Sequence, residues 1–585
     1  MRAEASWLTA VTVLLPFAAS AIIVVTGGTE RSRRILAFCY AVLAAGFNLA
    51  LLNAFLNRSH HTSWGSITFT PFGFPAFLVL NMLTVAAVLY AGFKPLSVPR
   101  PALLMATIPA ACGLGGMALV ATTLLSFVLM WLGVSAVAFV GLLAHDSVGL
   151  RPRFRAFVPW LLADALLASG ALLCSIWLKE SAVLIEPPLT SGNEAQVVTV
   201  MALFLASAFI RLAVFPVHAW SGDLVSRTDS SWSSFYLGGI NFLLAGMRLA
   251  IVIALVGRLV SSDWSAAIAI CALLSVVVGP IVAIRAGAAP GCVSGFYCAQ
   301  SGALLLSFAL FSRGGFEAGL FLLLVAPLFL TAFLMAFQTT GELRGTGRLG
   351  RQPLSVNAAP LVFGATLFSG MAIAGVPPMD GFVGKAMLAL ASSDKAGVRG
   401  FYALALFGVL VGLALGLVAV VRVLGGAYAA RGLAVSSRKP HLLEGLVPLG
   451  ICAASLMIGL FPGILSRNFI GGGSRLLFPR GFVGPGVVFR GTSDVVASAL
   501  SAYRVWGDVA GAFLLVLAVV TLIAYFASRA AHPPSGAAKQ MTPFLGGADG
   551  AYEFSWPDFP LKRGRGFESS VAWIKTRIGY LRSRR

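Results

Sequence analysis

Apolar stretches of about 20 residues recur along the chain from residue 8 almost to residue 530, with short polar loops between them. That length crosses a hydrocarbon core of about 30 Å as an α-helix. The stretches are expected to be helical, because an open strand in lipid would leave its peptide groups without partners. The pattern predicts an all-α polytopic membrane protein with about fifteen spans. The first stretch, "LTAVTVLLPFAASAIIVV", is too long for a signal peptide and is interpreted as an uncleaved span.

Composition and charge agree with this pattern and add an orientation. Hydrophobic residues make up 58% of the chain and charged residues 11%, against about 25% in soluble domains. The net charge of +21 does not indicate nucleic acid binding, because the basic residues lie in loops between spans. They gather in alternate loops, which predicts a plasma (inner) membrane protein with its N-terminus outside and its C-terminus in the cytoplasm. These residues are Arg31, Arg33, Arg34, Lys94, Arg100, Arg151, Arg153, Arg155, Arg344, Arg348, Arg351, Arg431, Arg438 and Lys439.

Motifs for cofactors are missing from the sequence. The seven cysteines all fall within apolar stretches, with no CxxC pair and no Cys/His cluster. No GxGxxG follows a strand, and GxxxxGK[ST] does not occur. We therefore expect no metal and no cofactor. Any enzymatic role would be that of a subunit in a proton-translocating oxidoreductase of the NADH dehydrogenase or hydrogenase type.

Two polar segments interrupt the apolar pattern. Residues 57–72 form an outside loop with β character, and residues 465–507 form a Gly-rich connection to a last span near 508–529. The tail ends with apolar residues at helical spacing among basic ones, which predicts an amphipathic helix on an anionic leaflet. A docking segment for a partner subunit and a plain basic end are alternatives. The apolar residues are Val571, Ile574, Ile578 and Leu581.

The chain is divided as follows. We expect N-terminal helices in 1–100, a first five-helix bundle in 101–260, a second, inverted bundle in 261–425, C-terminal helices in 426–530 and a cytoplasmic tail in 531–585.

The informative residues are ionisable ones inside spans, since each costs about 2.5 to 3.5 kcal/mol at a helix centre. Arg248 and Arg422 have an alternative interpretation, in which their side chains reach a membrane interface. The full set is Asp164, Arg211, His218, Arg248, Lys385 and Arg422.

Two of these charges lie beside predicted helix breaks. Arg211 precedes Pro216 by five residues, and Lys385 follows the Pro377-Pro378 pair. Proline removes a backbone hydrogen bond, and in a membrane such backbone survives only where it is buried in protein or lines a wet cavity. The breaks fall in spans seven and twelve, an odd number of spans apart. Five-span bundles around them would have opposite topology, as in ion-translocating proteins with inverted repeats.

The residues around both breaks resemble a known family. "FPVHAWSGDL" resembles "FPLHTWLPDAM" of the proton-translocating antiporter-like subunits of respiratory complex I, membrane-bound hydrogenases, Mrp antiporters and certain inorganic-carbon pumps. "GATLFSGMAIAGVPPMDGFVGK" resembles the family's "ALAGIPPLAGFFSK". Weaker similarities in "RPRFRAFVPWLLAD" and "AQSGALLLSFALF" extend the resemblance over roughly residues 75–425 in a consistent order.

The resemblance implies fourteen to sixteen helices, two inverted five-helix bundles and a chain of ionisable side chains at mid-membrane depth. Arg211 stands where the family has its span-seven lysine, and Lys385 stands at the span-twelve position. Other family positions have lost their charge: Leu132 or Gly133 replaces a span-five glutamate, Gly239 a span-eight histidine, and Thr331 lies near a central lysine.

These departures change the expected chemistry. A guanidinium stays protonated, so Arg211 is expected to hold an ion pair and not to relay protons. Asp164 is its first candidate partner, and Asp223 is the second. A buried lysine can exchange a proton, which favours Lys385 as a carrier. The chain between the two looks interrupted, because spans eight to eleven supply few ionisable groups.

Two further residues keep alternatives open. His218 either relays protons or binds local backbone groups. Asp223 either marks a site of proton uptake or caps a following helix.

Three functions follow from the resemblance. The first is a proton- or sodium-translocating subunit of a larger complex, using Lys385, His218 and water. The second is a non-pumping scaffold or coupling subunit, including the membrane subunit of a CO2/bicarbonate accumulation complex whose zinc sits in a partner. A single-chain transporter is the least supported. Expected partners are other membrane subunits, a peripheral cytoplasmic subunit and lipid, but not nucleic acid.

Overall fold

The computed structural model describes residues 2–57, 62–64, 67–69, 73–96, 98–121, 123–145, 150–177, 194–256, 262–350, 353–396, 400–428 and 438–470. The predicted Gly-rich connection beyond residue 470, the last span and the basic tail lie outside these residues.

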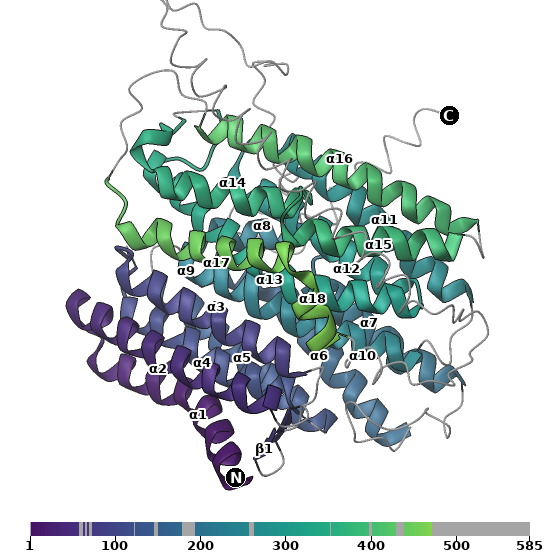
Figure 1. Cartoon of the computed structure of the whole chain (residues 1–585), viewed down its shortest axis with the longest axis horizontal. Helices are drawn as coiled ribbons and strands as arrows, with labels where there is room; N and C mark the ends of the chain where they lie inside the picture. Colours follow the sequence, from purple (N-terminus) through teal and green to yellow (C-terminus); the bar gives the residue numbers. More distant parts are fainter. Residues whose placement is uncertain are drawn as a thin grey trace, which may run out of the picture. The chain divides into compact units, whose positions relative to one another are not determined.

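Helices dominate the described residues, which confirms the all-α prediction (Figure 1). The β character expected in the loop after span two is also confirmed, as an antiparallel hairpin of β1 (Thr62–Trp64) and β2 (Ile67–Phe69). In chain order the helices are α1 (Arg2–Thr26), α2 (Glu30–Asn57), α3 (Gly73–Phe93), α4 (Pro101–Leu119), α5 (Leu124–Leu143), α6 (Leu150–Trp177), α7 (Glu194–Arg211), α8 (Ala219–Ser226), α9 (Ser230–Ser233), η1 (Ser234–Asn241), α10 (Phe242–Val256), α11 (Ser262–Arg285), α12 (Ala289–Ala309), α13 (Arg313–Arg344), η2 (Val356–Ala358), α14 (Pro360–Ala374), α15 (Asp380–Ala396), α16 (Phe401–Tyr428), α17 (Leu442–Leu460), α18 (Pro462–Leu465) and η3 (Ser466–Ile470).

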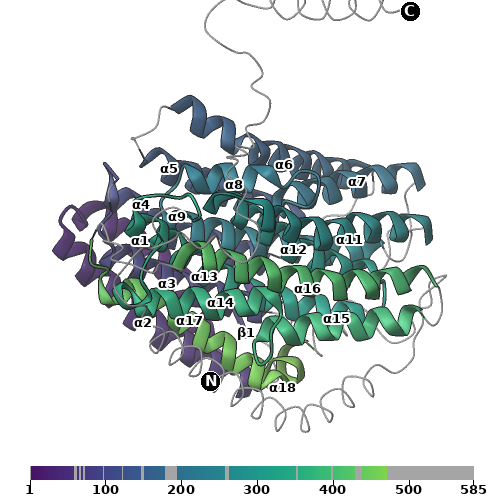
Figure 2. The ribbon, with the colours of Figure 1, turned by 90° about the horizontal axis from the view of Figure 1, so that it is seen from above.

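The long helices lie approximately side by side in both views (Figures 1 and 2). Among the described residues, twelve helices are long and apolar enough to cross a membrane. Two shorter apolar helices, Ala195–Arg211 and Pro360–Ala374, each continue after a break into a further helix. Counting each of these as one interrupted crossing gives twelve plus two, or fourteen spans. The interrupted spans are the seventh and the twelfth, as predicted.

The two breaks have the cause that the sequence suggested. α7 ends at Arg211 and α8 begins at Ala219, with Pro216 in the linker. α14 ends before Gly375, whose φ of 74° is the left-handed conformation that glycine adopts without a steric penalty, and Pro377 and Pro378 follow. The Phe215-Pro216 and Pro377-Pro378 bonds are cis. Because spans seven and twelve are five apart, they cross in opposite directions, as inverted bundles require.

Span eight is irregular too, although no proline interrupts it. Its middle, η1, is a π-helix between α9 and α10, a distortion that often occurs at functional sites. A Cβ built on Gly238 would stand 3.0 Å from the backbone nitrogen of Thr331. Glycine at this position therefore lets span eight approach α13 closely while the π-turn sets the direction of Asn241.

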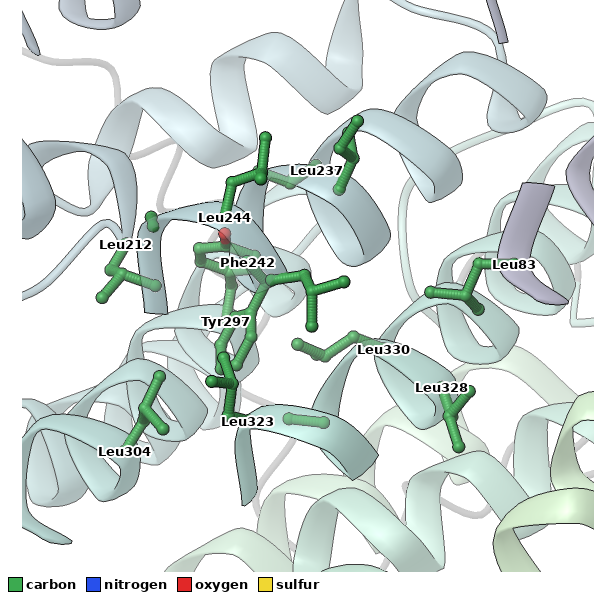
Figure 3. Packing of buried hydrophobic residues seen from close by; sticks show 14 of the residues in the cluster. Leu83, Leu212, Leu237, Phe242, Leu244, Tyr297, Leu304, Leu323, Leu328 and Leu330 are labelled. Atoms are coloured by element: carbon green, nitrogen blue, oxygen red, sulfur yellow. The ribbon is translucent and has the colours of Figure 1, made fainter. Parts of the chain in front are cut away.

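The centre of the fold is formed by α12, α13 and span eight. The apolar windows of these three spans are entirely buried, whereas those of α1 and α16 are 33% buried. Figure 3 shows part of this core, where leucines from several spans surround Phe242 and Tyr297. Polar groups on the central spans therefore lie away from lipid, where they need partners within the protein.

Candidate functional site

Arg211 is the last residue of α7 and is buried at the first break, where 2% of its surface is exposed. Its Nη2 donates hydrogen bonds to Oδ1 of Asp164 on α6 and to Oγ of Ser135 on α5. The guanidinium and the Asp164 carboxylate form a salt bridge, and both side chains are almost fully buried. The predicted pairing of Arg211 with Asp164 is therefore confirmed.

Two indole rings enclose this ion pair. The guanidinium carbon of Arg211 lies 4.2 Å from the ring centroid of Trp160 and 5.1 Å from that of Trp131. Trp131 Nε1 also donates to Asp164 Oδ1 over 2.7 Å. The faces of the rings attract the cation, and the indole N–H supports the anion. The site thus stabilises both charges where water is scarce.

The acid at this break sits on a different span from the family's glutamate. On α5, Trp131 and Ser135 are one turn apart and both contact the ion pair. Leu132 lines a groove of about 390 Å³ between α5 and α6, together with Ser135 and Asp164. In this chain the acidic partner of Arg211 therefore lies on span six.

Asn241 connects the ion pair to the centre of the fold. Its Oδ1 accepts a hydrogen bond of 3.2 Å from Arg211 Nη1, and its Nδ2 donates to the Arg211 carbonyl over 2.7 Å. That carbonyl is available because α7 ends there. Nδ2 of Asn241 also donates to the hydroxyl of Tyr297 on α12, over 3.0 Å. The Tyr297 hydroxyl is the polar atom in the otherwise apolar cluster of Figure 3.

Gln300 continues the polar line toward the second break. It lies three residues after Tyr297 on α12, a spacing that places two side chains on one helix face with Cβ atoms about 5–6 Å apart. Its Nε2 donates to the carbonyl of Ile373 on α14 over 3.1 Å. Lys385 Nζ donates to the same carbonyl. Gln300 and Lys385 also line a cavity of about 20 Å³, which is large enough for one water molecule.

Lys385 is buried in α15 just beyond the second break, with 8% of its surface exposed. Asp380, the first residue of α15, is completely buried in the same region. Its Oδ1 accepts hydrogen bonds from Gly381 N and from Ser455 Oγ on α17. Each break therefore holds one basic and one acidic side chain.

Sequence reasoning missed four residues of this line: Asn241, Tyr297, Gln300 and Asp380. The first three are neutral, so no charge distinguishes them within an apolar span. Asp380 does carry a charge, and it follows the Pro377-Pro378 pair of the second break and Met379. The rule that selected Lys385, a charge beside a break, would also have selected Asp380. Neutral polar groups on spans eight and ten therefore occupy part of the stretch between the two charged sites.

The other predicted residues lie apart from this line. His218 follows the first break, where its ring stacks on Phe215 with centroids 5.8 Å apart. Its backbone carbonyl accepts hydrogen bonds from the hydroxyls of Ser221 and Ser294, and these bonds do not involve the imidazole ring. Asp223 forms a part-exposed ion pair with Arg227 over 2.8 Å. Asp229, not Asp223, caps the helix that follows, by accepting from the Ser231 N–H.

Arg248 and Arg422 differ in their surroundings. Arg422 is exposed near the end of α16, as expected for a side chain that reaches an interface. For Arg248 that interpretation is wrong: the side chain is 2% exposed, and its guanidinium lies 3.7 Å from the ring centroid of Phe204. Its Nε and Nη2 have no hydrogen-bond partner within the described part of the chain. The apolar rings around it take the place of an acid.

A second buried charge cluster joins the ends of four spans. Lys94, just after α3, donates to Asp229 over 2.7 Å and to Glu342 over 2.6 Å. Arg438 bridges Glu342 to Glu444, the acidic residue in the first turn of α17. Burial by itself would lower the pKa of Lys94, but the charges of Asp229 and Glu342 outweigh burial and raise it above its usual value. Spans three and eleven thus end at the face where spans eight and fourteen begin.

Fourteen crossings among the described residues, with buried acidic and basic side chains beside the broken seventh and twelfth, are typical of ion-translocating membrane proteins. Residues 121–412 match the family described as "NADH:quinone oxidoreductase/Mrp antiporter, TM". The chain belongs to this family of antiporter-like membrane subunits.

Individual relatives agree with this assignment. The chain is 27% identical over 344 residues to NADH-quinone oxidoreductase subunit N 1 of Solidesulfovibrio magneticus, an alignment that covers 56% of this chain and 70% of the relative. It is 25% identical over 190 residues to NADH-quinone oxidoreductase subunit N of Salinibacter ruber, covering 32% of this chain and 37% of the relative.

Solved structures share the fold at lower identity. A chain of the Mrp complex from a Dietzia species matches with a TM-score of 0.66 at 19% identity, covering 82% of this chain and 98% of that one. A chain of respiratory complex I from Thermus thermophilus matches with a TM-score of 0.62 at 18% identity, covering 78% and 98%.

Proposed function

We propose that this chain translocates protons as an antiporter-like subunit of a multi-subunit membrane complex. The observation that carries the proposal is the line of buried polar groups between the two breaks. It runs from Asp164 and Arg211 through Asn241 to Tyr297, and from Gln300 to Lys385. Such a line is costly in a membrane interior and marks a path for ions or protons.

The residues of this line have different parts in the proposed mechanism. Arg211 keeps its proton, so it supplies a fixed positive charge and orients Asp164 and Asn241. Tyr297 and Gln300 accept and donate hydrogen bonds, which positions water between the breaks. Lys385 is the group that binds and releases a proton, because an ammonium in this setting is held by one backbone carbonyl and not by a fixed salt bridge. The charge state of Lys385 would then be coupled to the hydrogen bonding of the other residues in the line.

The partners and location follow from the same assignment. The relatives are subunits of NADH-quinone oxidoreductase, and the similar chains come from assemblies named as the Mrp complex and respiratory complex I. We infer that this chain also assembles with other membrane subunits and a peripheral cytoplasmic subunit. The loop charges support the plasma membrane, an outside N-terminus and a cytoplasmic C-terminus.

A non-pumping role is the second candidate. Leu132 or Gly133, together with Gly239, stands about where the family resemblance places charged residues, and Thr331 lies near another such position. A scaffold or coupling subunit, including that of a CO2/bicarbonate accumulation complex with zinc in a partner, would not need those charges. The two candidates differ in what Lys385 does.

Replacement of Lys385 separates the candidates. The complex is purified through a tag on this chain and reconstituted in liposomes, and a potassium diffusion potential drives proton movement that an internal pH dye reports. We expect Lys385→Ala to lower the proton flux at least about a hundredfold, the scale of a lost proton-transfer group. Lys395→Ala on the same helix, where the lysine lies 5.8 Å from the ring centroid of Tyr402, is the matched control. Unchanged flux in Lys385→Ala would favour the scaffold.

A further inference from the structure

Asp380 is a completely buried carboxylate at the second break, and only one of its oxygens has partners. Oδ1 accepts from the Gly381 N–H over 2.7 Å and from the Ser455 hydroxyl. Oδ2 is buried and has no hydrogen-bond partner within the described part of the chain. An unsatisfied carboxylate oxygen in such a place is costly while the group is charged. Protonation of Oδ2 would remove that charge and provide a donor.

Lys385 faces the same break from the other side of the α14 terminus. Its Nζ donates to the Ile373 carbonyl, and a Cβ on Gly381 would stand 1.9 Å from the preceding carbonyl, that of Ala372. Glycine at 381 therefore lets the start of α15 lie directly against the end of α14. The acid and the base thus flank two consecutive carbonyls at one broken helix end. Among the described residues, the titratable groups with an electrostatic interaction with Asp380 are Lys385 on its own helix and Cys452 on α17.

Span fourteen is packed closely onto this break. A Cβ on Gly459 would stand 2.1 Å from the Pro378 carbonyl and 2.7 Å from the Asp380 nitrogen, so only glycine permits this approach. Ser455, one turn earlier on α17, donates to Asp380. α17 therefore supplies a hydroxyl to the acid from outside the two five-helix bundles.

We propose that Asp380 is a proton-carrying residue that takes up the proton of Lys385 and so balances its charge, while the Ser455 hydroxyl of span fourteen supports the carboxyl group as a hydrogen-bond donor. This inference rests on the proposed function. When the Lys385 ammonium gives up its proton, an N–H bond breaks and an O–H bond forms at Asp380, with water in the break as the connection. The pair changes from ammonium and carboxylate to amine and carboxylic acid. Its net charge stays at zero, so neither half is left as a lone buried charge.

The simpler role for Asp380 is structural. An acidic residue in the first turn of a helix interacts favourably with the helix dipole, and it also holds α17 in place through Ser455. Asn at this position would keep the acceptor for Ser455 and Gly381 but could not take up a proton. Asp380→Asn therefore tests proton carriage with little change in packing, and Asp380→Glu restores a carboxyl group.

The test uses the tagged complex in liposomes, with proton flux and infrared difference spectra recorded on the same samples. We expect the wild-type spectra to show the carbonyl band of a protonated carboxylic acid as pH is lowered. Asp380→Asn should lose this band and at least about a hundredfold of the flux while keeping its melting temperature, and Asp380→Glu should recover both in part. Retained flux in Asp380→Asn, or an unchanged carboxyl band, would overturn the proposal.

Ser455→Ala tests the connection to α17, with Ser392→Ala as the matched control. Ser392 is a completely buried serine of α15 whose hydroxyl donates to the Leu388 carbonyl of its own helix. Ser455→Ala should shift the carboxyl band and slow the flux several-fold, and Ser392→Ala should do neither. A Ser455→Ala variant identical to wild type in both would refute the role of Ser455 in supporting the Asp380 carboxyl group.

Lys385→Ala distinguishes failure of this inference from failure of the proposed function. If Lys385→Ala abolishes the flux and Asp380→Asn does not, proton translocation stands and the role of Asp380 is refuted. If neither variant lowers the flux, the proposed function itself fails.

Discussion

The carboxylate of Asp164 and the guanidinium of Arg211 form a buried salt bridge, although the residues lie 47 positions apart on separate spans. The pair meets at the end of a broken helix, between Trp131 and Trp160. Because both charges are removed from water, each depends on the other far more than in a surface ion pair.

Neutralising one partner of this pair should therefore be strongly destabilising. We expect Asp164→Asn to lower the unfolding free energy by about 3–5 kcal/mol, because an uncompensated guanidinium is left in the interior. Thermal unfolding of the purified complex in detergent measures the change. Asp223→Asn is the control, since its pair with Arg227 is part-exposed and should contribute about 0–1 kcal/mol. Equal losses of unfolding free energy in Asp164→Asn and Asp223→Asn would contradict the conclusion that burial strengthens the mutual dependence of Asp164 and Arg211.

The acid should be transferable from span six back to span five. Leu132 lines the same groove as Asp164, so we expect Leu132→Glu to restore part of the stability that Asp164→Ala loses. Gly133→Glu is a poorer site, because its Cβ would stand 3.2 Å from Leu114. The test is to compare the melting temperatures of Asp164→Ala combined with Leu132→Glu and of Asp164→Ala combined with Gly133→Glu. No recovery from Leu132→Glu would show that a carboxylate at position 132 does not reach Arg211.

The Tyr297 hydroxyl should contribute to proton flux. Tyr297→Phe removes the acceptor of the Asn241 hydrogen bond. We expect the flux to fall about fivefold, the equivalent of about 1 kcal/mol, with a similarly small loss of stability. Tyr236→Phe is the matched control, because that buried hydroxyl donates to the Thr107 carbonyl away from the line. The same loss of flux in both variants would indicate a general packing effect.

The buried guanidinium of Arg248 should lower the unfolding free energy of the isolated subunit. Its guanidinium stacks on Phe204 but has two unpartnered nitrogens among the described residues. We expect Arg248→Met to raise the unfolding free energy by about 1–3 kcal/mol, because desolvation of the charge outweighs a cation–π contribution of about 2 kcal/mol. Arg422→Met, at an exposed position, should change it little. A loss of stability in Arg248→Met would mean that an anion or a partner group neutralises the arginine.

The Lys94 cluster predicts a stability that falls at alkaline pH. The pKa of Lys94 is raised in the folded protein above its value of 10.5 in the unfolded chain, so folding favours the protonated lysine. This contribution is fully present below pH 10.5 and is lost as pH rises toward the folded pKa. Melting temperatures recorded from pH 8 to about pH 11.5 check it. Lys94→Met should be less stable at pH 8 than the wild type, and its stability should fall less steeply at alkaline pH. An equally steep fall would mean that another group causes the alkaline loss of stability.

The features that could be predicted from the sequence are those marked by residues close together in the chain. Pro216 and the Pro377-Pro378 pair mark breaks within a few residues, and Arg211 and Asp164 are visible as charges in apolar stretches. Their pairing followed from the need of each buried charge for a partner. These features hardly depend on how the helices are rotated against each other.

The neutral part of the line depends on that rotation. Asn241, Tyr297 and Gln300 come from two spans, and uncharged polar residues occur in membrane helices for many reasons. Whether they meet depends on the π-turn in span eight and on the close approach at Gly238, neither of which has a distinctive sequence pattern. The direction of Arg248 was unpredictable for the same reason.

The permanent charge of Arg211 makes the two halves of the subunit electrically unequal. A guanidinium does not discharge at any physiological pH, so the seventh span holds a constant local field whatever the state of the cycle. In the proposed mechanism, Lys385 switches between charged and neutral. Changes of charge during turnover would therefore occur almost entirely around the twelfth span. The charge at the seventh span would stay constant throughout.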